Sequence, residues 1–156
     1  MKTAVIGVGN EYMGDDGIGP LLISRLKEIE GFPGDIDLID EGAGGMRIIH
    51  DMEGYDRVLI IDAADFGGAP GDYKVFHPEN VETVKELSGR SLHEMDLLRT
   101  VELARAMGSA PEDISIMAIQ PESIGMRRGI SASLERRVGD YIEAIIGRFE
   151  RTLAPS

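Results

Sequence analysis

A glycine-rich turn near the N-terminus constrains the fold of this chain more than any other feature. The apolar residues 3–6 lead directly into the turn, which is GVGNEYMGDDG at residues 7–17. Apolar, β-branched residues that end at glycines predict a buried strand. Residues 18–29 carry apolar side chains at helical spacing. The sequence therefore predicts a strand, a glycine loop with two adjacent carboxylates, and a helix that Asp15 or Asp16 could cap.

The glycine loop does not match a loop that binds a phosphate or a dinucleotide. The dinucleotide fingerprint Gly-x-Gly-x-x-Gly needs a glycine where this chain has Tyr12, and the lysine of a phosphate loop is absent. Asp15 and Asp16 lie where a bound phosphate would meet the helix N-terminus, and two carboxylates repel an anion. If one carboxylate only caps the helix, the other is left for solvent. As a pair in a glycine-rich loop, the two favour chemistry with a cation or a proton.

Composition limits the class of protein. The 156 residues fit a single domain over 1–156, and 42% of them are hydrophobic, which is enough for a core. The absence of cysteine excludes a disulfide framework, a thiolate metal site and a cysteine nucleophile. A net charge of −12 argues against nucleic acid as a partner and suits a cationic ligand or a basic peptide.

The N-terminus and the apolar runs bear on localisation. Residues 1–3 run straight into the first predicted strand, and no apolar run approaches the roughly 20 residues of a membrane span. We therefore expect no signal peptide, no membrane partner and a cytoplasmic protein.

The rest of the chain alternates predicted strands with predicted helices. Further strands are predicted at residues 35–40, 57–62, 73–76 and 114–119. Further helices are predicted at residues 46–52, 78–88, 94–107 and 131–151. Residues 57–62 are apolar on both faces, which indicates a central strand. The alternation predicts an α/β fold, a three-layer α/β/α sandwich around a mostly parallel, twisted sheet of about five strands.

Polar side chains follow the predicted strands. They are Asp16, Asp40, Glu41, Asp62, Asp65, Gln120 and Glu122. The carboxyl ends of parallel strands meet at one edge of the sheet, where such folds bind ligands. Because like charges repel, so many carboxylates at one edge predict a cation or a basic peptide that neutralises them.

The three histidines differ in their surroundings. We expect His50, on a short helix, and His77, at a strand-to-helix turn, to have surface or packing roles. His93 closes a polar loop directly before a strongly patterned helix and is the candidate ligand. Two carboxylates and one imidazole would suit Ni, Zn, Mn or Fe with coordination positions left open.

Four segments, taken together, form a pattern that runs in order along nearly the whole chain. They are GxGNxxxxDDGxG at residues 7–19, Asp62-Ala63 at the end of an apolar strand, Ser91-Leu92-His93, and Ile119-Gln120-Pro121-Glu122-Ser123. This pattern resembles the [NiFe]-hydrogenase maturation endopeptidases. The resemblance implies a phosphorylase/hydrolase-like fold. It also implies removal of a C-terminal extension from the precursor of the hydrogenase large subunit, after nickel has been inserted.

The resemblance also implies a set of site residues. The metal-contacting positions of the family correspond to Asp16, Asp62 and His93, with nickel carried by the substrate and no organic cofactor. Asp40 matches the aspartate of the family's second loop, whereas Ala43 stands where many relatives have a hydroxyl. We connect that difference with substrate specificity rather than with the reaction. Candidate catalytic bases are Asp40 and the unengaged oxygen of Asp16 or Asp62.

Two alternatives remain open at this point. One is a zinc-dependent peptidase or amidohydrolase that carries its own metal, and the other is a non-catalytic chaperone that only binds the large subunit. A serine nucleophile is not predicted, because Ser91 and Ser123 lack a glycine-elbow context. The resemblance further implies a monomer that meets its precursor transiently.

Overall fold

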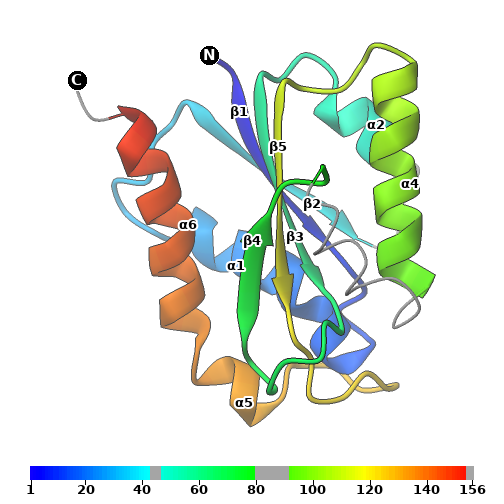
Figure 1. Cartoon of the computed structure of the whole chain (residues 1–156). Coiled ribbons are helices and arrows are strands. Elements are labelled where there is room, and N and C mark those ends of the chain that lie inside the picture. Colours follow the sequence, from blue (N-terminus) through cyan, green and yellow to red (C-terminus); the bar gives the residue numbers. More distant parts are fainter. Residues whose placement is uncertain (43–46, 80–91, 154–156) are drawn as a thin grey trace.

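The chain forms one five-stranded sheet with helices on both faces (Figure 1). The computed structural model describes residues 1–42, 47–79 and 92–153, without the side chains of residues 92–96 and 150–153. The strands are β1 (Thr3–Val8), β2 (Ile36–Gly42), β3 (Arg57–Ala63), β4 (Tyr73–Phe76) and β5 (Asp113–Ile119). Their order in the sheet is β2-β1-β3-β5-β4. Only β4, at one edge of this sheet, is antiparallel to its neighbour.

The described helices complete a three-layer sandwich, as predicted. They are the short 3₁₀ helix η1 (Gly14–Gly17), α1 (Ile18–Lys27), α2 (Arg47–Met52), α4 (Leu92–Ala106), α5 (Ala132–Glu135) and α6 (Val138–Leu153). Helices α1 and α6 cover one face of the sheet, while α2 and α4 cover the other (Figure 1). None of the described helices is both long enough and apolar enough to cross a membrane.

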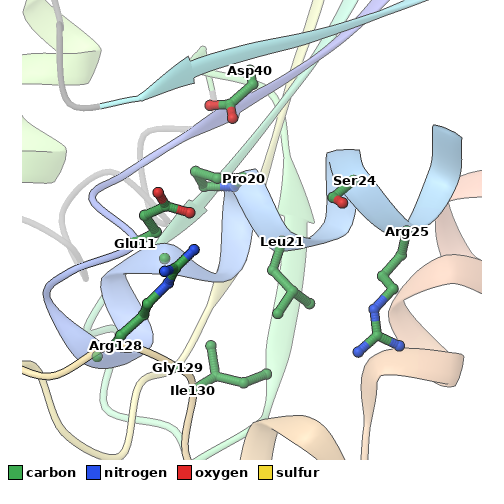
Figure 2. Close-up of a pocket in the computed structure, with 11 residues that line it drawn as sticks. Glu11, Pro20, Leu21, Ser24, Arg25, Asp40, Arg128, Gly129 and Ile130 are labelled. Atoms are coloured by element: carbon green, nitrogen blue, oxygen red, sulfur yellow. The ribbon is translucent and has the colours of Figure 1, made fainter.

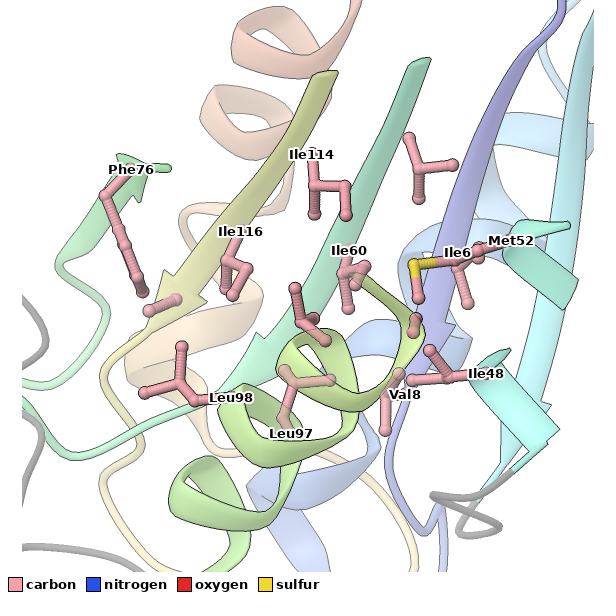
Figure 3. Packing of buried hydrophobic residues seen from close by; sticks show 14 of the residues in the cluster. Ile6, Val8, Ile48, Met52, Ile60, Phe76, Leu97, Leu98, Ile114 and Ile116 are labelled. Atoms are coloured by element: carbon pink, nitrogen blue, oxygen red, sulfur yellow. The ribbon is translucent and has the colours of Figure 1, made fainter. Parts of the chain in front are cut away.

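Each face of the sheet buries its own hydrophobic cluster. Against α2 and α4 the strands place residues such as Ile6, Ile60 and Ile116, which meet Ile48 and Leu97 (Figure 3). The alternate strand residues pack against α1 and α6 on the opposite face. Both faces of the central strands are therefore dry, which explains why these strands are apolar throughout rather than alternating.

Two glycines of the first turn allow close approach of the backbone. A Cβ on Gly19 would lie 2.6 Å from the carbonyl oxygen of Val8, so α1 begins in direct contact with β1. Gly9 has a φ of +139°, and a Cβ there would lie 1.9 Å from the carbonyl oxygen of Asp16. The glycine loop therefore places η1 against the end of β1, a role that its composition predicts.

Some local predictions need correction. The helix predicted at residues 131–151 is two helices, because the chain turns at residues 136–137, where the backbone N–H of Arg137 donates to the carbonyl of Leu134. Helix α4 begins at Leu92 rather than at residue 94, so His93 lies within the helix and not in the loop before it. The helix predicted at residues 78–88 falls mostly outside the described residues.

The predicted capping of α1 by an aspartate is also wrong. The residue at the N-cap is Gly17, and no side chain makes a capping hydrogen bond there. The 3₁₀ helix η1 carries both aspartates instead, one turn before α1 begins. The carboxylates of Asp15 and Asp16 therefore make contacts other than the capping of α1.

Candidate active site at the carboxyl edge of the sheet

Four parallel strands end at one edge of the sheet, as the sequence predicts. In this sheet Gly7 of β1 lies beside Asp40 of β2 on one side and beside Ile61 of β3 on the other. Asp40 and Asp62 therefore flank the loop that follows β1 and carries Asp16. The topology places the three candidate aspartates at the ends of three adjacent strands.

Asp15 is a structural anchor rather than a reactive group. Its carboxylate is completely buried and accepts hydrogen bonds from the backbone N–H groups of Glu122 (2.8 Å), Ser123 (3.1 Å) and Ser131 (2.6 Å). It also accepts one from the Ser131 hydroxyl at 2.9 Å. Burial alone would raise the pKa of Asp15, but these hydrogen bonds outweigh burial and hold the pKa below its usual value. The anchor therefore ties η1 to the loop that follows β5.

Asp16, the next residue, has a different environment. Its side chain is partly exposed, and its Oδ2 accepts a hydrogen bond from the backbone N–H of Asn10 at 2.9 Å. That bond holds the carboxylate over the end of β1, where Gly9 leaves room for it. Of the two adjacent carboxylates, Asp16 is thus the one available to a ligand.

Asp62 lies near the end of β3 with its side chain fully buried. It shares a small cavity of about 10 Å³ with Ala64, Leu97 and Leu98, on the face of the sheet that α4 covers. His93 precedes Leu97 by four residues, about one helical turn. The backbone thus brings the first turn of α4 to the same face as Asp62, while the His93 side chain lies outside the described part of the structure.

Asp40 lies on the other face of the sheet. Its exposed carboxylate faces α1, near Pro20 and Ser24, and its Oδ1 accepts a hydrogen bond from the backbone N–H of Gly42 at 3.0 Å (Figure 2). Successive residues of a strand point to opposite faces, so neighbouring strand ends need not present side chains to the same side. The sheet therefore separates Asp40 from Asp62.

A groove runs past Asp40 along the start of α1. It has a volume of about 360 Å³ and adjoins a second hollow of about 240 Å³, since both are lined by Glu11, Pro20 and Asp40. Two cations, Arg25 and Arg128, line the larger hollow together with Gly129 and Ile130 (Figure 2). A groove of this size, lined by charges of both signs and by apolar side chains, can hold several residues of an extended peptide.

Comparison with known proteins decides the family. A family model described as hydrogenase maturation protease matches residues 20–148, which is most of the chain. The chain belongs to the hydrogenase maturation protease family. This agrees with the family that the four sequence segments resemble.

Individual members of the family are similar in sequence and in structure. The hydrogenase expression/formation protein HoxM of Cupriavidus necator is 30% identical over 141 residues, covering 87% of this chain and 70% of that protein. The hydrogenase 2 maturation protease of Escherichia coli is 26% identical over 147 residues, covering 94% of this chain and 89% of that protein. The solved structure of the E. coli maturating endopeptidase HybD has a TM-score of 0.85 at 25% identity, covering 97% of this chain and 94% of that one.

Two further polar residues of this family member have roles that the sequence did not reveal. Glu41 follows Asp40, yet its side chain is only 1% exposed; its nearest cation is Arg47, whose Nε lies 3.8 Å from Oε1. That oxygen is buried, and no group in the described part of the chain donates a hydrogen bond to it. Gln120 holds the loop after β3, because its Oε1 accepts hydrogen bonds from the backbone N–H groups of Phe66 (2.9 Å) and Gly68 (3.1 Å). Position at a strand end was the sequence signal for both residues, and Gln120 also belongs to one of the four segments that resemble the family.

The remaining histidines lie on the surface, as predicted. His50 is exposed on α2, and His77 is exposed with its Nδ1 2.9 Å from the carbonyl oxygen of Ile114. Among the side chains that the structure describes, no three histidine or acidic groups gather closely enough to hold a metal ion. That statement does not extend to His93.

Proposed function

We propose that the chain is an endopeptidase that removes the C-terminal extension from the nickel-loaded precursor of a [NiFe]-hydrogenase large subunit in the cytoplasm. Membership of the hydrogenase maturation protease family supports this proposal. The observation that carries it is the order of the strand ends: the loop that carries Asp16 follows β1, Asp62 lies near the end of the neighbouring β3, and the first turn of α4 lies on the same face as Asp62. We infer a monomer that meets its precursor transiently.

Asp16, Asp62 and His93 are proposed to contact the nickel ion that the precursor carries. Two carboxylates and one imidazole bind nickel less strongly than a set containing soft thiolates, so the ion stays with a precursor that holds it through cysteines. Asp62 is buried, so a cation that binds beside it would compensate part of the cost of its desolvation. The site therefore recognises whether the precursor is loaded, because an unloaded precursor brings no counter-charge.

The proposed reaction is hydrolysis of one peptide bond. A water molecule adds to the scissile carbonyl carbon, a carboxylate base takes its proton, and the C–N bond breaks as the leaving amine receives a proton. Nickel in the substrate would polarise the carbonyl. The candidate bases are Asp40 and the unengaged oxygen of Asp16 or Asp62. Because Asp40 and Asp62 lie on opposite faces of the sheet, Asp40 could serve as the base only for a peptide bond that lies on the α1 side of the strand ends.

The test is incubation of the purified protein with nickel-loaded precursor, followed by mass spectrometry of the precursor. We expect loss of one C-terminal peptide, no cleavage of nickel-free precursor, and no cleavage by the His93→Ala variant at unchanged thermal stability. Processing at the normal rate by His93→Ala would overturn the site. Stable binding of the loaded precursor without any loss of mass would instead identify a non-catalytic binding protein.

A further inference from the structure

Large apolar side chains are exposed on two neighbouring loops, one of which contributes Tyr12 to the smaller hollow beside the groove. Tyr12 of the glycine loop is 59% exposed, and Ile124 and Met126 of the loop after β5 are 52% and 93% exposed. The two segments are joined, because Gly14 donates a backbone hydrogen bond of 2.8 Å to the carbonyl of Arg127. We call these three side chains the apolar rim.

The apolar rim lies on an anchored backbone. Asp15 accepts hydrogen bonds from both ends of the loop, at residues 122–123 and at Ser131. Within the loop, the Arg127 guanidinium donates to Ser123 Oγ at 2.6 Å. A backbone held in this way loses little conformational entropy when a partner binds, which favours affinity. Apolar side chains exposed on a rigid loop, rather than folded back onto the core, indicate an interaction surface.

A cation accompanies the apolar rim. Arg128 stacks over the Tyr12 ring, 5.6 Å from the ring centroid, in a chain of net charge −12, whereas the neighbouring Arg127 is paired with the buried Asp15 at 3.7 Å. Tyrosine, methionine and arginine are the residue types enriched at protein interfaces. The complementary surface on a partner is therefore apolar and bordered by carboxylates.

The apolar rim is continuous with the groove. Arg128 lines the groove as well as stacking on Tyr12, and Glu11 precedes Tyr12 in the same wall (Figure 2). A chain that lies in the groove therefore continues into a protein body that covers the apolar rim. This continuity connects the rim with the substrate rather than with an unrelated partner.

We propose that the apolar rim is the docking surface for the folded body of the precursor, through an apolar patch bordered by carboxylates. The inference rests on the proposed function. Docking at the rim supplies affinity and positions the tail, while the groove and the metal-contacting residues act on the tail itself. The rim therefore governs KM and leaves the chemical step to other residues.

The test compares two double variants with matched side chains. Ile124→Ser with Met126→Ser removes the apolar loop residues, whereas Leu103→Ser with Met107→Ser removes a residue of α4 and the residue directly after its end, which are 42% and 63% exposed. With nickel-loaded precursor we expect the loop variant to raise KM by about tenfold or more, with kcat within about twofold. The variant with Leu103→Ser and Met107→Ser should keep KM and kcat unchanged. Arg128→Glu also raises KM and removes part of its dependence on salt.

The outcomes separate this inference from the proposed function. An unchanged KM for the loop variant, with normal processing by the unmodified protein, overturns the docking surface alone. Absence of processing by the unmodified protein overturns the proposed function. If sedimentation shows that the unmodified protein dimerises and the loop variant does not, the rim binds a second copy and the proposal is wrong. A thermal melt of each variant verifies folding, and substitutions of exposed side chains of this kind should leave the melting temperature nearly unchanged.

Discussion

Asp15 accepts a 2.6 Å hydrogen bond from the backbone N–H of Ser131, a residue 116 positions further along the chain. Its neighbour Asp16 accepts one from Asn10, only six positions away, and remains partly exposed. Two adjacent carboxylates in one 3₁₀ helix therefore have separate tasks. One holds a distant loop in place, and the other is available to a ligand.

Asp15→Asn should lower the free energy of unfolding by about 2 kcal/mol at pH 7, because the amide offers one acceptor oxygen to donors that occupy two. Urea denaturation measures the change. The matched variant Asp16→Asn should differ from the unmodified protein by less than about 1 kcal/mol, since its remaining carbonyl oxygen can accept the hydrogen bond from Asn10. Equal losses for the two variants would contradict the separate tasks.

The same anchor predicts a dependence on pH. The pKa of Asp15 is held below its usual value, so its stabilising effect is complete above the unfolded pKa of about 4 and is lost as the pH falls through the folded pKa. The difference in stability between the unmodified protein and Asp15→Asn should stay constant from about pH 5 to 8 and shrink below about pH 4. A difference in stability that grew on acidification would contradict a lowered pKa of Asp15 in the folded protein.

Asp16→Asn should reduce processing of nickel-loaded precursor by about 100-fold or more, because the neutral amide binds a cation poorly. Time courses of precursor cleavage measure the loss. Glu143→Gln, which changes an exposed carboxylate on α6, is the control and should process normally. Full activity of Asp16→Asn would remove this carboxylate from the site.

The purified protein should hold well under about 0.1 equivalent of metal after treatment with a chelator, and its melting temperature should not change, because the ion arrives with the precursor. Elemental analysis and a thermal melt give both values. Stoichiometric zinc that survives chelation would favour a zinc-dependent peptidase that carries its own metal.

Gly9→Ala should lower the free energy of unfolding by about 3 kcal/mol or more, because the added Cβ would lie 1.9 Å from the carbonyl oxygen of Asp16. Gly54→Ala is the control, since Gly54 has a φ of +87° but open space around its Cβ, so it should lose only about 1 kcal/mol. Urea denaturation measures both losses. Similar losses for the two variants would mean that the positive φ, rather than the contact with Asp16, causes the loss of stability.

Glu41→Gln should raise the free energy of unfolding by on the order of 1 kcal/mol at pH 7, because it removes a charge from a side chain that is 1% exposed. No described residue donates a hydrogen bond to its Oε1, and the Nε of Arg47 lies 3.8 Å away. Chemical denaturation at fixed salt measures the change. A loss of stability above about 1 kcal/mol would show that the carboxylate is held more strongly than its contact with Arg47 indicates.

The local periodicity of apolar residues predicted much of the fold. The apolar run at residues 57–62 predicted a central strand, and the pattern of residues 94–107 predicted a helix, both of which the structure confirms, with Leu97, Val101 and Ala104 on the buried face of α4. These patterns succeed because a side chain's burial in a strand or helix follows from its position in the repeat. The turn that ends α5 depends instead on a 3₁₀-type hydrogen bond at Arg137, which the continuous apolar spacing did not indicate.

By itself the sequence determined which residues reach the carboxyl edge of the sheet, since that follows from the order of strands and loops along the chain. Only the tertiary structure decided which of those side chains lie on the same face of the sheet and near one another. Asp15 became an anchor through donors more than 100 positions away, and Asp40 and Asp62 came to opposite faces of one sheet. Such assignments depend on which side chains and backbone groups meet after folding, and no local pattern encodes them.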